Sequence, residues 1–218
     1  MQFRQESPRP VRRAVTAACV ERWAGAARRA LAASPPGDPD RQPTSGSLRL
    51  LALGPGWLDD FDAALRPLAL GSGSVSGWTL LRHDSWLRVQ HPVASRPPGE
   101  HPHGWHQDGA LGHDFLCAAV EPARPRTMCT LWLPLVDCGN RAPSLEWLAV
   151  EEPVLLPPDQ LVDAALRQRH PVAPRVHAVL AAGDALVFGG GLLHRTHVTP
   201  AMTQPRISLE LRWVPTPA

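Results

Sequence analysis

The segment His103-Gly104-Trp105-His106-Gln107-Asp108-Gly109 contains the residues best suited to metal chemistry. His106 and Asp108 are two residues apart, and on a strand or at its end alternate side chains share one face. We therefore expect the imidazole and the carboxylate to point the same way and to occupy two neighbouring positions on one metal ion. A third ligand must come from elsewhere, because this segment cannot curl back to supply it.

His194 is the predicted third ligand. It follows an apolar strand at 185–188 and three glycines, within the run Leu193-His194-Arg195-Thr196. In a β-sandwich, strands that are distant in sequence face each other, so His194 can complete the site. Two imidazoles and one carboxylate on one face of a metal form the triad of non-haem Fe(II) oxygenases. A structural zinc site is instead closed by four ligands, which typically include thiolates.

An arginine follows the third candidate ligand. Arg206 stands twelve residues after His194 and begins an alternating strand over 206–213. The rigid fork of a guanidinium binds a carboxylate through two hydrogen bonds and keeps its charge when it is partly buried. The sequence thus predicts a carboxylate-binding group beside the metal.

Other histidines are weaker candidates, since ten occur in the chain and a His-x-Asp pair alone is common. His197 lies three positions after the third candidate ligand, so on a strand it should face the opposite side. His101 and His103 could form a metal-binding pair, but the prolines and glycines around them favour a loop at the mouth of the site. His113 and Asp114 are adjacent, so their side chains should point apart.

The predicted elements fall into two parts of a single domain. Residues 1–75 are expected to form an N-terminal helical arm packed on the core, with helices at 11–33 and 58–68. Residues 76–218 contain short apolar segments separated by proline and glycine, which indicate a sandwich or barrel. The predicted strands are 78–90, 128–136, 145–150, 177–180, 185–188 and 207–214. One further helix is predicted at 159–168.

Composition limits the classes of function. The 218 residues are 44% hydrophobic and carry a net charge of +2, which gives no indication of a nucleic-acid partner. No apolar run reaches the roughly 20 residues of a membrane helix, so we expect no membrane partner. Four widely spaced cysteines, without a CxxC pair, indicate reduced thiols in a cytoplasmic protein: Cys19, Cys117, Cys129 and Cys138. The sequence carries no signal for an oligomeric state.

Taken together, these motifs resemble the phytanoyl-CoA dioxygenase family of Fe(II)/2-oxoglutarate oxygenases. The resemblance rests on Trp105–Gly109, on Gly183-Asp184 before a strand, on Leu193–Thr196 and on Arg206, and it covers about residues 76–216. It implies a mainly β fold, with a double-stranded β-helix (jelly-roll, cupin-like) core, flanking N-terminal helices and iron between the two sheets. The implied cofactors are Fe(II), the co-substrate 2-oxoglutarate and O2.

The resemblance also implies roles for individual residues. The implied iron ligands are His106, Asp108 and His194. Arg206 matches the residue that pairs with the far carboxylate of 2-oxoglutarate, and Thr196 matches a position that often adds a hydroxyl to it. Trp132 is expected to line the co-substrate pocket. Arg88 and Gln90, on the strand before the motif, are expected to point into the site.

The implied reaction is hydroxylation or desaturation of a small-molecule substrate, with release of succinate and CO2. Asp108 fills the ligand position that a small residue occupies in related halogenases, which argues against halogenation. Two alternatives remain at this point: a cupin-like metalloenzyme that does not use 2-oxoglutarate, and a catalytically silent jelly-roll binding module. The chain departs from the family pattern at Ser144, where many relatives show glycine. The spacing from His194 to Arg206 is also about one residue longer than expected, which a bulge at 203–205 could absorb.

Overall fold

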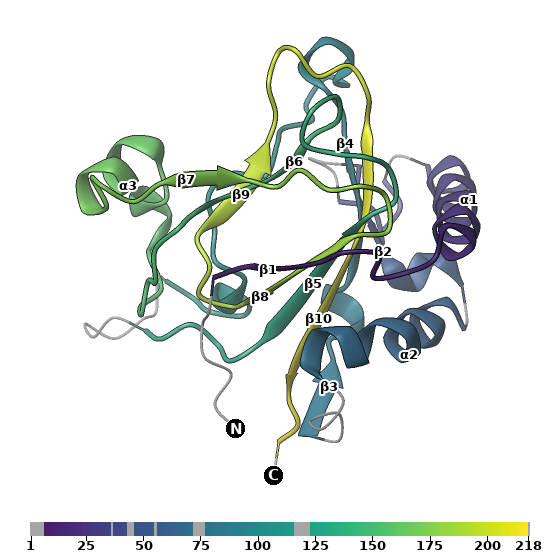
Figure 1. Ribbon diagram of the computed structural model, residues 1–218, viewed down its shortest axis with the longest axis horizontal. Coiled ribbons are helices and arrows are strands. Elements are labelled where there is room, and N and C mark those ends of the chain that lie inside the picture. Colours follow the sequence, from purple (N-terminus) through teal and green to yellow (C-terminus); the bar gives the residue numbers. More distant parts are fainter. Residues whose placement is uncertain are drawn as a thin grey trace.

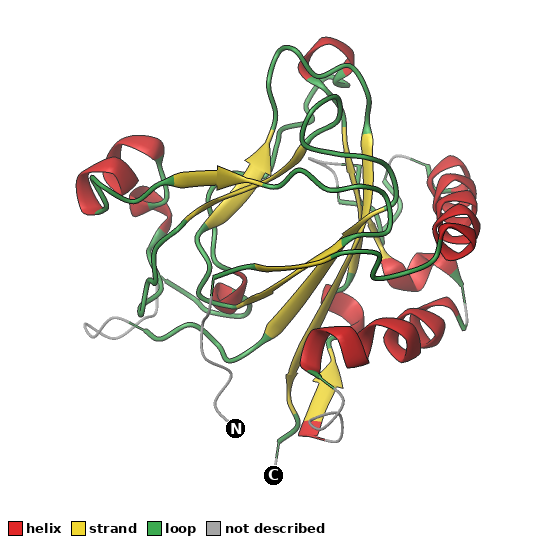
Figure 2. Cartoon of the chain, in the orientation of Figure 1, coloured by secondary structure: helices red, strands yellow, loops and turns green. Residues whose placement is uncertain are grey.

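A computed structural model describes residues 7–35, 37–42, 46–54, 56–71, 77–115 and 123–217 of the chain. Two antiparallel sheets face each other at the centre, and helices α1 and α2 lie against the outside of the larger sheet (Figure 1). Strands make up most of the core, and the three α-helices lie at its periphery (Figure 2). This arrangement confirms the predicted mainly β, jelly-roll fold with flanking N-terminal helices.

The larger sheet has seven strands, and its order is β1-β8-β5-β10-β4-β2, with β3 also paired to β10. In that order, with β3 last, the strands are Arg9–Val11, Ala185–Gly189, Cys129–Pro134, Arg206–Pro215, Trp86–Gln90, Leu48–Arg49 and Trp78–Leu80. The smaller sheet has the order β7-β6-β9, and its strands are Arg175–His177, Ser144–Leu148 and His194–His197.

Three α-helices and several short turns of 3-10 helix complete the described chain. The α-helices α1, α2 and α3 are Ala17–Ala33, Trp57–Leu70 and Asp163–Arg169. The 3-10 turns are η1 Leu50–Leu53, η3 Arg82–Asp84, η4 Val93–Ser95, η5 Asp108–Ala110 and η6 Pro158–Gln160. Helix α1 begins where the Thr16 side chain accepts a hydrogen bond from the Cys19 amide at 3.3 Å, a standard N-cap contact. Within the described residues, no helix is long and apolar enough to cross a membrane.

Strand β10 separates the hydrophobic layer from the interior of the sandwich. Successive side chains of a strand point to opposite faces. Leu209, Leu211 and Trp213 belong to the core cluster formed with the helices. The polar residues at the even positions therefore face the other way, between the two sheets, and all four are buried: Arg206, Ser208, Glu210 and Arg212.

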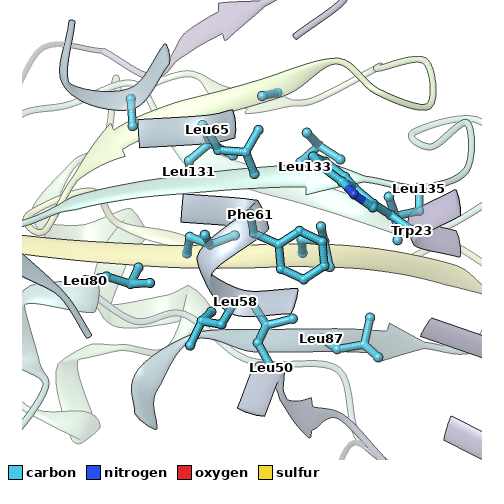
Figure 3. Packing of buried hydrophobic residues seen from close by; sticks show 14 of the residues in the cluster. Trp23, Leu50, Leu58, Phe61, Leu65, Leu80, Leu87, Leu131, Leu133 and Leu135 are labelled. Carbon is cyan, nitrogen blue, oxygen red and sulfur yellow. The ribbon is translucent and has the colours of Figure 1, made fainter. Parts of the chain in front are cut away.

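Helices α1 and α2 cover the outer face of the larger sheet with a close-packed apolar layer (Figure 3). Trp23 of α1 meets Phe61 of α2 edge to face, with ring centroids 5.0 Å apart, and both side chains are almost fully buried. Leu131 and Leu133 of β5 belong to the same cluster. Full burial of one such side chain contributes roughly 1.5–3 kcal/mol, so this layer holds the larger sheet against the helices.

The N-terminal arm differs from its prediction because it also contributes strands. Strand β1 pairs with β8, and β2 pairs with β4, so the arm extends both ends of the larger sheet. These strands have three and two residues, too few to show an alternating pattern. We propose that residues 1–75 and 76–218 form one domain, since shared sheet and core contacts join the two parts.

Several predicted boundaries also move. The predicted strand at 78–90 is two strands, β3 and β4, separated by the turn η3. Strand β7 ends at His177, whereas the prediction placed a strand at 177–180. The first helix begins at Ala17 rather than at residue 11, because residues 9–11 are in a strand. Strand β9 was not predicted as a strand, because its residues, His194–His197, are all polar.

Candidate active site

His106 and His194 lie side by side because the segment that carries His106 pairs with strand β9. The His106 amide donates to the His194 carbonyl at 2.9 Å, and the His194 amide donates back at 3.1 Å. Their ring centroids are 4.1 Å apart. Asp108 Oδ1 lies 3.8 Å from His106 Nε2. One potential ligand atom from each of the three residues lies within 4.8 Å of the others, close enough to share a metal ion.

Backbone carbonyls set the tautomer of both imidazoles. His106 Nδ1 lies 2.8 Å from the Gly104 carbonyl, and His194 Nδ1 lies 3.0 Å from the Leu192 carbonyl. A carbonyl oxygen can only accept, so both Nδ1 atoms carry the proton. In each neutral ring the lone pair is therefore on Nε2, and this second hydrogen bond fixes the orientation of the ring as in metal sites.

The charges of the site suit a divalent cation. Burial, followed by the nearby His194 and His103, holds the pKa of His106 well below its usual range, so its ring is neutral at pH 7. Burial acts to raise the pKa of Asp108, but the charge and hydrogen bond of the Arg212 guanidinium hold it well below its usual range. A neutral imidazole and an ionised carboxylate are the forms that bind metals. The donor set therefore fits Fe(II).

Arg206 lies in the same cavity, which has a volume of about 280 Å³ and is also lined by His106 and His194. Its Nη1 donates to the Ser144 carbonyl at 3.1 Å, and its guanidinium lies 5.4 Å from the Trp132 ring centroid. Its Nε has no hydrogen-bond partner, and no acidic side chain pairs with it, among the described residues. Burial lowers the pKa of Arg206 to about 10. A buried cation without a carboxylate partner is suited to an anionic ligand.

Thr196 and Trp132 also line this cavity. Thr196 follows His194 by two positions on β9, so the two side chains share the inner face. Trp132 is on the inner face of β5, and its Nε1 has no hydrogen-bond partner among the described residues. Both residues thus lie beside the guanidinium and the imidazoles in one continuous wall.

Arg88 and Gln90 also line the cavity, but their polar groups contact other parts of the protein. Arg88 donates to both carboxylate oxygens of Glu210, at 3.0 and 3.2 Å, and to the Gln42 side chain at 2.8 Å. Gln90 Nε2 lies 3.3 Å from a carboxylate oxygen of Glu100. These two residues shape the wall rather than present free donors to a ligand.

The competing histidines are separated from the triad or border it. His197 is on the outer face of β9, where its ring stacks on His177 with centroids 4.7 Å apart. His101 and His103 line the cavity, in agreement with their predicted place at the mouth of the site. Among the described residues, the group that could hold a metal contains neither His113 nor Asp114.

Gly109, which ends the motif, allows a close approach of two backbone segments. Its amide donates to the Gly190 carbonyl at 2.8 Å. A Cβ at Gly109 would lie 2.9 Å from that carbonyl oxygen and 2.7 Å from the Pro125 Cβ. Neither distance is possible without a shift of the chain, so a side chain here would move the segment that carries Asp108.

Sequence reasoning missed the groups around Asp108. Arg212 Nη2 donates to Asp108 Oδ1 at 2.8 Å, and Thr130 Oγ1 donates to Oδ2 at 2.7 Å. Glu210, which borders the cavity, pairs with Arg212. The alternation of strand 206–213 could have indicated Glu210 and Arg212, because polar residues occupy every second position there, opposite an apolar face. The sequence alone did not show that this polar face is buried.

A family model described as phytanoyl-CoA dioxygenase (PhyH) matches residues 38–199. This match spans well over half of the 218 residues, and the chain belongs to that family. The protein is accordingly a non-haem iron oxygenase that depends on 2-oxoglutarate and O2. A comparison with curated protein sequences found no match.

Solved structures share the fold at low sequence identity. The non-haem alpha-ketoglutarate-dependent epimerase SnoN from nogalamycin biosynthesis is 18% identical, with a TM-score of 0.72 over 98% of this chain and 80% of SnoN. EvdO2 from Micromonospora carbonacea var. aurantiaca, complexed with 2-oxoglutarate, is 18% identical, with a TM-score of 0.68 over 100% and 89% of the two chains. EctD from S. alaskensis, with 2-oxoglutarate and 5-hydroxyectoine, is 16% identical, with a TM-score of 0.69 over 98% and 74%.

Family membership decides between the three functions that the sequence left open. It favours the 2-oxoglutarate-dependent enzyme over a cupin-like metalloenzyme and over a silent binding module. The described geometry agrees, because the metal-binding group and the buried guanidinium border one cavity.

Proposed function

We propose that His106, Asp108 and His194 hold Fe(II) and that the enzyme hydroxylates or desaturates a small molecule. The observation that carries this proposal is the convergence of the three ligand atoms within 4.8 Å, with both Nδ1 atoms bound to backbone carbonyls. The two rings thereby present their Nε2 lone pairs and need no rearrangement to bind a metal. Asp108 supplies the third ligand, which leaves no ligand position for a halide.

The co-substrate site in this proposal centres on Arg206. Its buried guanidinium would pair with the far carboxylate of 2-oxoglutarate, and the hydroxyl of Thr196 would add a hydrogen bond. Trp132 would form a wall of the pocket, in contact with the guanidinium. Arg88 and Gln90 of β4 complete the lining beside Arg206, since Gln90 is the cross-strand partner of Arg206 and Arg88 that of Ser208.

Fe(II) and 2-oxoglutarate, when bound, supply the activation of O2 and the oxidation of a C–H bond, with release of succinate and CO2. The protein's part is to orient these groups and to exclude water. The apolar side chains of Val89, Leu145 and Phe188 form part of the cavity wall and limit the access of water to the site.

The substrate is proposed to be a small molecule rather than a nucleic acid or a membrane component. In support, one SnoN structure contains Fe3+, alpha ketoglutarate and nogalamycin RO, and the EctD structure contains 5-hydroxyectoine. The net charge of +2 is too small to indicate a polyanionic partner. We also propose a cytoplasmic location, supported by three free thiols among the described residues: Cys19, Cys129 and Cys138. Cys117 is outside the described residues.

The test is an anaerobic titration of the purified protein with Fe(II) and then 2-oxoglutarate, followed by visible absorption. A metal-to-ligand charge-transfer band should appear with the wild-type protein and be absent from His106→Ala and Asp108→Ala, which should retain their fold by circular dichroism. Iron binding without this band would contradict the role of 2-oxoglutarate. Substantial turnover by Asp108→Ala would contradict the ligand assignment.

A further inference from the structure

Both oxygens of the Asp108 carboxylate are held by side chains of the larger sheet. Arg212 donates to Oδ1 at 2.8 Å and Thr130 donates to Oδ2 at 2.7 Å. The Asp108 and Arg212 side chains are 3% and 6% exposed, and Thr130 is fully buried. Water therefore does not compete for these hydrogen bonds, and a carboxylate held at both oxygens cannot rotate about its Cβ–Cγ bond.

The sheet register builds this pair of contacts. Arg212 of β10 and Thr130 of β5 are direct cross-strand partners, so both side chains leave the same face at the same level. The Asp108 oxygen that Arg212 contacts is also the one that lies 3.8 Å from His106 Nε2. That oxygen thus points towards the proposed metal position while the other is turned to Thr130.

Arg212 is itself fixed by further contacts. Its Nη1 donates to the Asp84 carbonyl at 2.7 Å, and its guanidinium also pairs with Glu210. Glu210 is held in turn by Arg88, whose Nη1 donates to Gln42. A chain of ion pairs therefore runs from Arg88 through Glu210 and Arg212 to Asp108, and Gln42 connects it to the N-terminal arm. The planar fork of arginine can make these contacts together, which the single ammonium of lysine cannot.

A purely stabilising role does not account for this arrangement well. Burial of two ions costs desolvation free energy that their attraction often fails to repay, so a buried ion pair is weak evidence of stabilisation. In contrast, removal of a group that hydrogen-bonds to a metal ligand typically weakens metal binding. Arg212 donates to the Asp108 oxygen that lies nearest His106 Nε2, as expected for a group that positions a metal ligand.

We propose that Arg212 and Thr130 are positioning residues that hold Asp108 so that it offers one oxygen to the metal. This inference rests on the proposed function, because it takes Asp108 as a ligand. The polar face of β10 would then bind the co-substrate through Arg206 and position the carboxylate of Asp108 through Arg212.

The experiment measures binding of Co(II) alone by anaerobic calorimetry, together with the visible spectrum of the bound Co(II), which reports the coordination geometry. Arg212→Met should weaken binding about 10- to 100-fold and change the spectrum. Arg212→Lys should recover part of the affinity, and Thr130→Val should weaken binding by a smaller factor at nearly constant volume. The matched control is Arg169→Met, which removes a guanidinium from another buried carboxylate, that of Glu152. It should lower the melting temperature without changing the affinity for Co(II).

The outcomes separate this inference from the proposed function. Wild-type affinity and spectrum in folded Arg212→Met and Thr130→Val, even with lowered melting temperatures, would show a merely structural role and overturn the inference alone. If Arg212→Met does not fold, Thr130→Val decides by the same two measurements. Failure of the wild-type protein to bind Co(II) would overturn the proposed function and this inference together.

Discussion

Replacement of Arg206 by methionine should make the protein more stable while it weakens 2-oxoglutarate binding. Burial lowers the pKa of Arg206 from 12.5 to about 10, which at about 1.4 kcal/mol per pH unit corresponds to a cost of about 3 kcal/mol at pH 7. This cost is present below the folded-state pKa and is relieved only as the pH rises from about 10 towards 12.5. Methionine matches the arginine side chain from Cβ to Nε but carries no charge.

Part of this gain is lost with the hydrogen bond from Arg206 to the Ser144 carbonyl, since a bond from a charged donor contributes about 2 kcal/mol. The net effect should be a gain of about 1 kcal/mol in the free energy of unfolding, or roughly 2–4 °C in melting temperature for a chain of this size. Affinity for 2-oxoglutarate should fall by about two to three orders of magnitude, because loss of one partner of a buried charge pair costs about 3–5 kcal/mol.

The assay is thermal unfolding without and with Mn(II) and 2-oxoglutarate, paired with calorimetric titration of 2-oxoglutarate. Arg88→Met is the matched control, because this arginine is also largely buried but is already paired with Glu210. Its removal should lower the melting temperature. The reasoning is refuted if Arg206→Met is destabilised as much as Arg88→Met, or if it still binds 2-oxoglutarate with wild-type affinity.

Three further predictions concern the sheet and its supports. Phe61→Ala should lower the free energy of unfolding by roughly 3–5 kcal/mol in chemical denaturation, while Co(II) affinity of the folded protein stays unchanged. Asp184→Ala should cost about 1–3 kcal/mol in the same assay, because the Arg13 amide at 2.8 Å and the Ala181 amide at 3.1 Å lose their acceptor. In Glu210, burial acts to raise the pKa, but Arg212 and Arg88 lower it from 4.5 to about 2. Its contribution to stability is complete above pH 4.5 and is lost as the pH falls towards about 2. Glu210→Gln should therefore flatten the pH dependence of stability over that range.

The sequence was sufficient to predict the features that depend on short-range spacing. His106 and Asp108 are two residues apart in the chain, and Arg206 begins a strand with clear alternation. Burial of the 206–213 face was not predictable in the same way, because either face of an alternating strand can point to solvent. The role of Arg212 depends on a contact with Asp108, 104 residues away, which only the assembled sheets create.

Short and polar elements were the other source of error. Strand β9 is formed by polar residues whose backbone pairs with β6 and whose first residue pairs with His106. Strand β1 has only three residues and pairs with β8, which follows much later in the chain. Pairing of this kind is decided by tertiary contacts, since neither segment has a local pattern of its own.

Strand β10 restricts where this enzyme can accept insertions and deletions. Its Arg206 and Arg212 share one face, so loss or gain of one residue between them would turn one of the two towards the apolar helix layer and bring a leucine into the cavity. A length change before the strand leaves this alternation intact. The structure has such a place in the loop at 203–205, where the amides of Thr203 and Gln204 both donate to the Arg141 carbonyl.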